Sequence, residues 1–395
     1  MPDVRPGPWL RLTALTAAGA CGTAVVSGAL HLDTAHRVLA ALVLPLLCAL
    51  LAAAWVAHRR LITPAAVALG AFLAAALVTP RPAHLTLAAF ALAAALVAVA
   101  GCFRGEPVQR ASVRDYVTLT KPRIMTLLLL TGAAGMVVGA GGLPGAGTFA
   151  VTMVGLGLAC GGASALNHVL DRDIDRLMPR TGARPVAVER ITPARALEFG
   201  LALSAFSFVL LASLVNVLTA VLALVGNLFY VLVYTRWLKR STSQNIVIGG
   251  AAGAVPPLVG WAAATGNLTV PALFLFLIVF FWTPPHFWAL ALLLKRDYEA
   301  ARIPMLPVVR GERETARQIV WYSLVLVAVT LLPFAWRTVG VVYLAAALLL
   351  GAAFLRLAWR LRRDTTLARA RALFRFSILY LALLFVLMAL DPLLG

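Results

Sequence analysis

An asparagine and three aspartates follow a long apolar segment in the stretch NHVLDRDIDR, residues 167–176. On a continuous helix Asn167, Asp171 and Asp175 recur every four residues and lie within an arc of about 80°, whereas Asp173 points away. Three hard oxygen donors on one face suit Mg²⁺, whereas Zn²⁺ would favour His or Cys. The motif therefore predicts a magnesium site at the end of a membrane helix. The alternative is a solvated helix end at which aspartates pair with arginines.

Basic residues and a second acidic segment are expected on the same side of the membrane as this motif. The segment KRDYEAARIPMLPVV contributes Asp297, with Glu299 two residues later. Carboxylates facing carboxylates and surrounded by bases suit Mg²⁺ bridging to a diphosphate, to which Arg offers forked hydrogen bonds and Lys a point charge. Many of these bases could instead serve only to fix the topology. The candidate diphosphate-binding residues are Lys121, Arg123, Arg180, Lys239 and Arg240.

A diphosphate clamped by a metal inside a helical bundle implies a lipid tail that runs into the membrane. Ionisation of an allylic diphosphate leaves a carbocation and pyrophosphate, and the metal and bases stabilise the charge that builds on the leaving oxygens. Water must be kept from the cation, which an apolar chamber within the membrane achieves. The nucleophile would then be a π-rich acceptor.

Membrane helices are the elements that must position these residues. Of the 395 residues 62% are hydrophobic and 12% are charged, whereas a soluble protein has about 45–50% apolar and about 25% charged residues. The mean hydropathy is +0.93, and apolar runs long enough to span a bilayer recur along the chain. We predict an all-α polytopic membrane protein rather than a β-barrel, which would show short alternating segments. Thirteen spans are predicted, at about 12–30, 36–57, 62–79, 83–103, 124–141, 149–168, 197–215, 217–234, 246–264, 270–293, 318–335, 339–355 and 374–391.

The net charge of +19 is distributed as the positive-inside rule requires, and it does not indicate nucleic-acid binding. With the N-terminus in the cytoplasm, all of the 34 lysines and arginines except Arg37, Arg81 and Arg337 fall in cytoplasmic segments. We therefore predict a multi-pass protein of the cytoplasmic (inner) membrane of a bacterium, with its active site facing the cytoplasm. Two domains are expected: a four-helix membrane domain over residues 1–105 and a nine-helix domain over residues 106–395.

Five segments of the second block resemble the intramembrane prenyltransferases of the UbiA type, and more narrowly the heme-directed branch of protoheme IX farnesyltransferases. They occur in the family's order and cover about residues 112–320. The N-x3-D-x3-D element is typical of the superfamily, whereas WTPPHFWAL and IPMLPVV point to heme. The matching segments are DYVTLTKPRIMTLLLLT, NHVLDRDIDRLMPRT, YTRWLKRSTSQNIVIGGAAGAVPPLVGW, FFWTPPHFWALAL and DYEAARIPMLPVV.

This resemblance implies a nine-helix bundle that transfers farnesyl from farnesyl diphosphate to a vinyl group of protoheme IX (heme B), giving heme O for terminal oxidases. It implies Mg²⁺ as cofactor, with Asn167, Asp171 and Asp175 as the first metal–diphosphate cluster and Asp297 anchoring the second. Many superfamily members have two well-spaced aspartates in the second cluster, and here only Asp297 with Glu299 is available. Two alternatives stay open. One is a related enzyme acting on a quinone precursor or another tetrapyrrole, and the other is a non-catalytic heme-binding protein or transporter.

The segment WTPPHFWAL has a physical interpretation of its own. Pro284 and Pro285 remove two N–H donors late in a predicted span, which is tolerated where a helix lines a cavity. An intramembrane histidine is a functional candidate, and the flanking aromatic rings could stack on a porphyrin. We predict that His286, Trp282 and Trp288 contact heme. The alternative is a packed histidine that bonds to a carbonyl group freed by the prolines.

The first block carries two histidines, His36 and His84, that open predicted spans running in the same direction. They should lie at one depth and could ligate one heme through both axial positions. The surrounding AHRVLA and AHLTLA weakly resemble half of a heme A synthase, which makes a bound heme and a partnership with that enzyme hypotheses. A purely structural block is the alternative.

Overall fold

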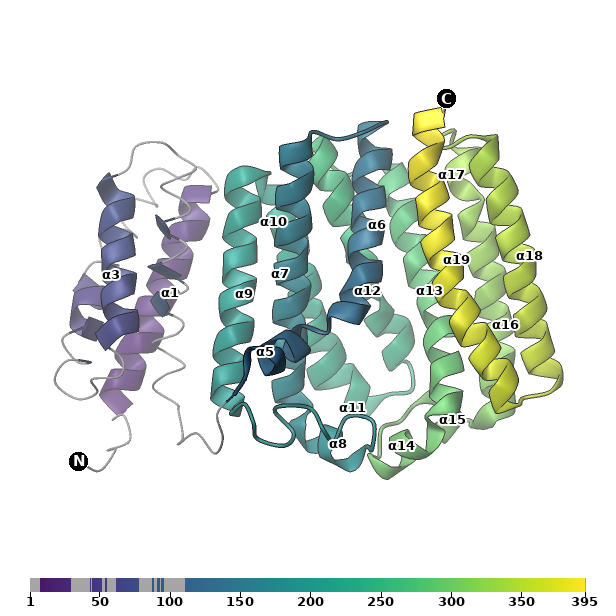
Figure 1. Ribbon diagram of the computed structural model, residues 1–395, viewed down its shortest axis with the longest axis horizontal. Coiled ribbons are helices and arrows are strands. Elements are labelled where there is room, and N and C mark those ends of the chain that lie inside the picture. Colours follow the sequence, from purple (N-terminus) through teal and green to yellow (C-terminus); the bar gives the residue numbers. More distant parts are fainter. Residues whose placement is uncertain are drawn as a thin grey trace. The chain divides into compact units, whose positions relative to one another are not determined.

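The structure is a computed structural model that describes residues 8–29, 43, 45–51, 54, 62–77, 87, 88, 91, 92, 94, 95 and 111–394 (Figure 1). Over these residues the secondary structure is helical, with turns, and contains no strands, which confirms the predicted fold class. The helices are α1 (Pro8–Ala29), α3 (Ile62–Leu77), α5 (Val113–Thr120), α6 (Pro122–Ala140), α7 (Ala146–Leu170), α8 (Arg172–Leu177), α9 (Pro193–Leu214), α10 (Val217–Leu228), the π-helix η2 (Phe229–Leu238), α11 (Lys239–Ser241), α12 (Asn245–Thr265), α13 (Val270–Leu293), α14 (Lys295–Ala300), α15 (Leu306–Val309), α16 (Gly311–Thr330), α17 (Leu332–Ala335), α18 (Val341–Arg363) and α19 (Leu367–Leu394).

Nine helices of the described part are long and apolar enough to cross a membrane, and all of them follow residue 121. The protein is therefore an integral multi-pass membrane protein, as predicted. The apolar helices found before residue 111 are shorter, at Leu12–Ala24 and Ile62–Ala75. The predicted spans 36–57 and 83–103 fall largely outside the described residues. The span predicted at 217–234 is longer than expected, because the helix continues to Ser241.

The chain divides into two compact units, and each is described by itself. Unit 1 comprises Met1–Lys121, Gly157–Val169 and Arg184–Val221. Unit 2 comprises Pro122–Leu156, Leu170–Ala183 and Leu222–Gly395. The expected boundary at residue 105 follows a different criterion, the end of the first apolar block, and stays a prediction.

Close helix packing in unit 1 depends on small residues. A Cβ atom on Gly162 of α7 would lie 2.8 Å from the carbonyl oxygen of Gly200 on α9, so these helices approach as small residues allow in membrane proteins. The short helix α5 begins with a capping box, in which Ser112 and Asp115 exchange backbone-to-side-chain hydrogen bonds. Hydrogen bonds from Ser112, backbone first and then hydroxyl, lower the pKa of Asp115, and Arg190 adds to the effect from 3.0 Å.

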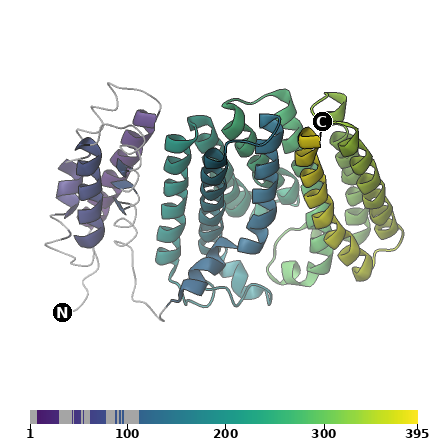
Figure 2. The same ribbon diagram turned by 45° about the horizontal axis from the view of Figure 1, so that its top comes forward.

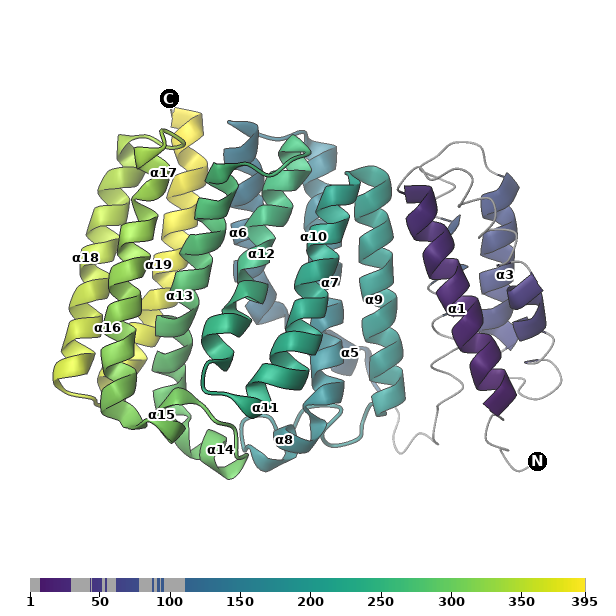
Figure 3. The ribbon, with the colours of Figure 1, turned by 180° about the vertical axis from the view of Figure 1, so that it is seen from behind.

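Unit 2 is held together by a continuous apolar core to which α6, α12, α13, α16, α18 and α19 contribute. Helices α6 and α12 cross at backbone contact, because a Cβ atom on Gly260 would lie 1.9 Å from the carbonyl oxygen of Gly132. Figures 2 and 3 show α16, α18 and α19 running alongside one another. The short helices α8, α11 and α14 lie at one common end of the long helices of unit 2 (Figures 1 and 3).

Candidate functional site

The acidic motif lies where α7 gives way to α8. Asp171 lies between the two helices and occupies the N-cap position of α8, with φ −93° and ψ 2°, so the prediction of one continuous helix across the motif was wrong. The N–H of Asp175 donates to the carbonyl oxygen of Asp171 at 2.8 Å, so helical hydrogen bonding resumes at Asp171. Asn167, Asp171 and Asp175 are all buried, whereas the side chain of Asp173 is 61% exposed. The motif therefore separates into three enclosed oxygen-bearing side chains and one exposed carboxylate.

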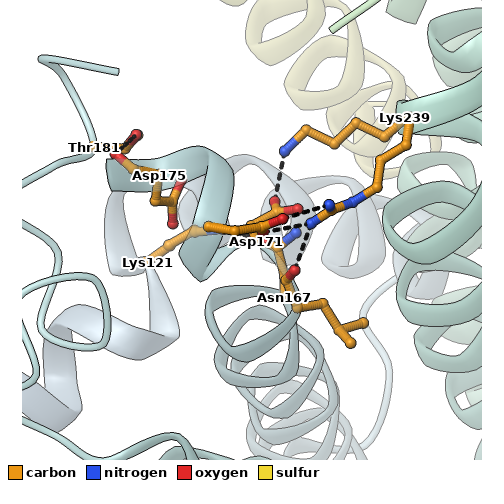
Figure 4. A network of polar contacts seen from close by, with 9 residues as sticks. Lys121, Asn167, Asp171, Asp175, Thr181 and Lys239 are labelled. Atoms are coloured by element: carbon orange, nitrogen blue, oxygen red, sulfur yellow. Dashed lines mark hydrogen bonds and ion pairs between the residues drawn. The ribbon is translucent and has the colours of Figure 1, made fainter. Parts of the chain in front are cut away.

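Two basic residues from the end of the α10–η2–α11 helix contact the aspartates within unit 2, and Figure 4 shows the contact of Lys239 with Asp171. Lys239 Nζ lies 2.5 Å from Asp171 Oδ2, and the side chains are 10% and 1% exposed. Arg240 makes a forked contact to both carboxylate oxygens of Asp173 at 2.7 Å and donates to the carbonyl oxygen of Leu170. Hydrogen bonding to Arg240 lowers the pKa of Asp173 to about 2.

Lys121 binds the first residue of the motif within unit 1. Its Nζ donates to Asn167 Oδ1 at 2.7 Å (Figure 4). The Lys121 backbone has φ 51° and ψ 59°, a left-handed conformation that few residues other than glycine adopt. Such a conformation persists where its surroundings impose it, and it often occurs at functional sites. Lys121 ends α5 immediately before Pro122 begins α6, so the junction of two helices imposes it here.

A π-helical segment, η2, precedes Lys239. Segments of this kind are rare, usually short, and frequent at functional sites. Tyr230 and Tyr234 stack within it at 5.6 Å between ring centroids. The ring of Tyr234 rests on Gly249 of α12, where a Cβ atom would lie 2.2 Å from Tyr234 Cδ2. π winding turns each residue through a smaller angle than α winding. The side chain of Lys239, which follows η2, therefore points in a different direction from the one that a continuous α-helix would give it.

The second acidic segment shares its electrostatic surroundings with the first. Tyr234 is within electrostatic range of Asp171 and Arg180, which flank α8, and of Tyr298 on α14. Tyr298 is buried on α14, and the preceding residue, Asp297, is partly exposed in the first turn of that helix. Both acidic segments therefore occupy the end of unit 2 at which α8, α11 and α14 lie (Figure 1). Arg123 and Arg180 are exposed, and no side-chain hydrogen bond or ion pair is found for Asp297 within the described residues.

The donor set fits Mg²⁺ rather than a metal held by protein side chains alone. Within the described ranges, no three Asp, Glu, His or Cys side chains gather closely enough to hold an ion. Magnesium is commonly bound by one or two carboxylates, completed by waters and substrate phosphates. The two buried carboxylates of unit 2 in this motif, Asp171 and Asp175, match that description.

The predicted heme-contact residues lie in unit 2 on α13. The helix continues through Pro284 and Pro285, so the prolines remove N–H donors without interrupting it. His286 is stacked between Trp282, at 4.3 Å between centroids, and Phe374 of α19, at 4.9 Å. His286 Nδ1 lies 2.7 Å from Ser377 Oγ.

Trp288, the third predicted heme contact, is 2% exposed and packs edge-on against Tyr322. Its indole Nε1 is buried and has no hydrogen-bond partner among the described residues. His36 and His84 lie outside the described residues, so the second heme stays a prediction.

Sequence reasoning missed Tyr234 and Ser377, and no pattern in the chain signals either.

Comparisons with known proteins give one family. The UbiA prenyltransferase family matches residues 128–384. The chain is 56% identical over 281 residues to a protoheme IX farnesyltransferase of Symbiobacterium thermophilum, covering 71% of this chain and 94% of that protein. It is 51% identical over 284 residues to one from Synechocystis sp., covering 71% and 89%. The match to one from Thermus thermophilus is 50% identical over 291 residues and covers 73% of this chain but 48% of that protein.

Solved structures show the same fold at low sequence identity. A digeranylgeranylglyceryl phosphate synthase superposes with a TM-score of 0.61 at 16% identity, over 72% of this chain and 99% of the other. A UbiA homolog from Archaeoglobus fulgidus, bound to GPP and Mg²⁺, superposes with a TM-score of 0.52 at 16% identity, over 69% and 99%.

Proposed function

This chain belongs to the UbiA prenyltransferase family and, within it, to the protoheme IX farnesyltransferases, and on that premise we propose how its residues serve the reaction. The enzyme transfers a farnesyl group from farnesyl diphosphate to a vinyl group of heme B, giving heme O. The farnesyl C–O bond breaks as pyrophosphate leaves, the allylic cation adds to the terminal vinyl carbon, and water captures the new cation and loses a proton, which completes the hydroxyethylfarnesyl chain.

The observation that carries the proposed site is the buried ion pair of Lys239 with Asp171. Burying two opposite charges stabilises a protein little or not at all, so the pair is better explained by a task in catalysis. In the free enzyme the ammonium group of Lys239 neutralises the Asp171 carboxylate, and that of Lys121 donates a hydrogen bond to the amide oxygen of Asn167. When the diphosphate binds, they turn to its oxygens and stabilise the negative charge that the leaving group acquires.

We propose that Asn167, Asp171 and Asp175 hold Mg²⁺ and that Asp297 contributes from α14. The ion supplies Lewis-acid neutralisation of the diphosphate. The side chains of Arg123, Arg180 and Arg240 extend the basic surroundings. Of these, Arg240 is paired with Asp173 in the free enzyme and must exchange partners to reach phosphate.

The acceptor is assigned to α13. His286 and Trp282 lie within the membrane, and about two helical turns separate His286 from the end of α13, beyond which α14 carries Asp297. A heme held beside them would bring its vinyl edge toward the head of the farnesyl chain. Following the positive-inside rule, we place this end of the bundle at the cytoplasmic face of a bacterial inner membrane.

Reconstitution with heme B, farnesyl diphosphate and Mg²⁺, with product identified by mass spectrometry, tests these assignments. Asp171→Ala should abolish heme O formation, and chelating divalent cations should do the same. Asp364→Ala is the matched control, because Asp364 carries an exposed ion pair with Arg369 in the α18–α19 loop and should leave the rate unchanged. Full activity of Asp171→Ala, or turnover in excess chelator, would contradict the clamp. Alkylation of a quinone precursor in preference to heme B would instead favour the alternative acceptor.

A further inference from the structure

Ser377 of α19 contacts both proposed heme-binding residues of α13. Its carbonyl oxygen accepts a hydrogen bond from Trp282 Nε1 at 2.7 Å. Its hydroxyl oxygen lies 2.7 Å from His286 Nδ1 and 2.7 Å from the carbonyl oxygen of Phe374. Ser377 is fully buried, so water does not compete for these contacts. One residue therefore holds the indole and the imidazole together.

The number of available hydrogen atoms decides which group donates in the hydrogen bond between His286 Nδ1 and the Ser377 hydroxyl. A serine hydroxyl has one hydrogen to donate. Two oxygens 2.7 Å apart need that hydrogen between them, so the Ser377 hydroxyl donates to the carbonyl oxygen of Phe374. The contact with His286 is left with one solution, in which Nδ1–H donates and the Ser377 oxygen accepts. A neutral imidazole protonated at Nδ1 carries its lone pair on Nε2.

The neighbours of His286 leave Nε2 as the ring nitrogen that can bind a ligand. Trp282 and Phe374 cover the two faces of the ring, and Phe287 meets it edge-on with an interplanar angle of 88°. Ser377 occupies Nδ1. These neighbours carry no charge, which favours the neutral imidazole in a buried position, and 8% of the residue remains exposed.

We infer that Ser377 is a positioning residue that holds His286 as the Nδ1–H tautomer and so presents the Nε2 lone pair to the heme acceptor, where it can coordinate the iron. The inference rests on the proposed function, because it deepens the assignment of His286 to heme. Ligands of this kind are commonly oriented by a hydrogen bond to their other nitrogen, and loss of that partner typically weakens binding.

The tautomer can be measured without any substrate. In protein labelled with ¹⁵N-histidine and embedded in lipid bilayers, solid-state NMR separates protonated from unprotonated ring nitrogens, and His286→Ala assigns the signal. We expect protonated Nδ1 and unprotonated Nε2 in the wild type, and loss of that preference in Ser377→Ala. An unprotonated Nδ1 in the wild type would overturn the inference, as would an unchanged tautomer in Ser377→Ala. Neither outcome depends on farnesyl transfer, which the reconstitution assay tests separately.

Heme affinity provides the second measurement. We expect Ser377→Ala to bind heme B roughly 10- to 100-fold more weakly than the wild type, with loss of the absorption spectrum of nitrogen-ligated iron. Added imidazole should restore that spectrum in His286→Ala. Ser323→Ala is the matched control, because Ser323 is also buried and donates to a carbonyl oxygen of its own helix, but hydrogen-bonds to no histidine in the described part of the chain. An unchanged heme spectrum and affinity in Ser377→Ala would refute the positioning role. Equal loss in Ser323→Ala would refute it too, since disturbed helix packing would then suffice.

Discussion

Replacement of Lys239 by methionine removes the charge that neutralises Asp171 and keeps most of the side-chain volume. The two side chains are 10% and 1% exposed, and removing one partner of a buried pair costs about 3–5 kcal/mol of folding free energy. Removing both should cost far less, because no uncompensated charge stays buried. We therefore expect Lys239→Met to unfold at lower temperature than the double variant Lys239→Met/Asp171→Asn, in a double-mutant cycle of thermal unfolding in detergent.

The effect of Lys239→Met on the catalytic rate should differ from its effect on the free energy of unfolding. A unit charge about 4 Å from a developing charge contributes about 4 kcal/mol at an effective dielectric constant near 20, which corresponds to a loss of about a thousandfold in kcat/KM. Mg²⁺ without diphosphate should stabilise Lys239→Met more than the wild type, since the ion then meets no competing ammonium at Asp171. Additive effects in the cycle, together with equal stabilisation by Mg²⁺, would refute the reasoning.

Three further predictions follow from the fold. Gly260→Ala should destabilise unit 2 by about 1–3 kcal/mol in thermal unfolding, because its Cβ atom would meet the Gly132 carbonyl oxygen. Asp173→Asn should change stability by only about 0–1 kcal/mol at neutral pH, since its pair with Arg240 is exposed. Because the folded pKa of Asp173 is lowered to about 2 from 3.8, the wild type should lose this contribution only as the pH falls through that interval. Ser112→Ala should cost about 1 kcal/mol, visible as faster hydrogen exchange in α5.

Apolar length and motif spacing were enough to predict the helical membrane fold. They also selected Asn167, Asp171 and Asp175, each of which is buried, and Asp171 is paired with Lys239. Extrapolating a uniform helix failed at Asp171, where the backbone departs from α geometry. It also failed after Leu228, where π winding begins in a segment without Gly or Pro to announce it.

Besides these departures from helix geometry, the contacts between distant segments could not be predicted from the sequence. Ser377 follows His286 by 91 residues, and one buried serine looks like any other in an apolar helix. Lys121 was selected as a base, but its left-handed backbone was not, because the residue before a proline usually adopts an extended conformation. In each case the deciding information is which helix end meets which, and this depends on packing across the bundle.

The neighbouring bases Lys239 and Arg240 contact their aspartates differently in the free enzyme. Arg240 fits Asp173 with both arms of its planar fork and also binds the carbonyl oxygen of Leu170, which fixes α8 to the end of α11. Lys239 carries a point charge on a flexible side chain and makes a single hydrogen bond to Asp171. Its ammonium group can therefore move to a phosphate oxygen without breaking a bidentate contact. Lys239→Arg should therefore keep the charge and most of the stability, yet lose much of the activity in the heme O assay. Wild-type turnover in that variant would mean that charge alone suffices and that the transfer of Lys239 between partners plays no part.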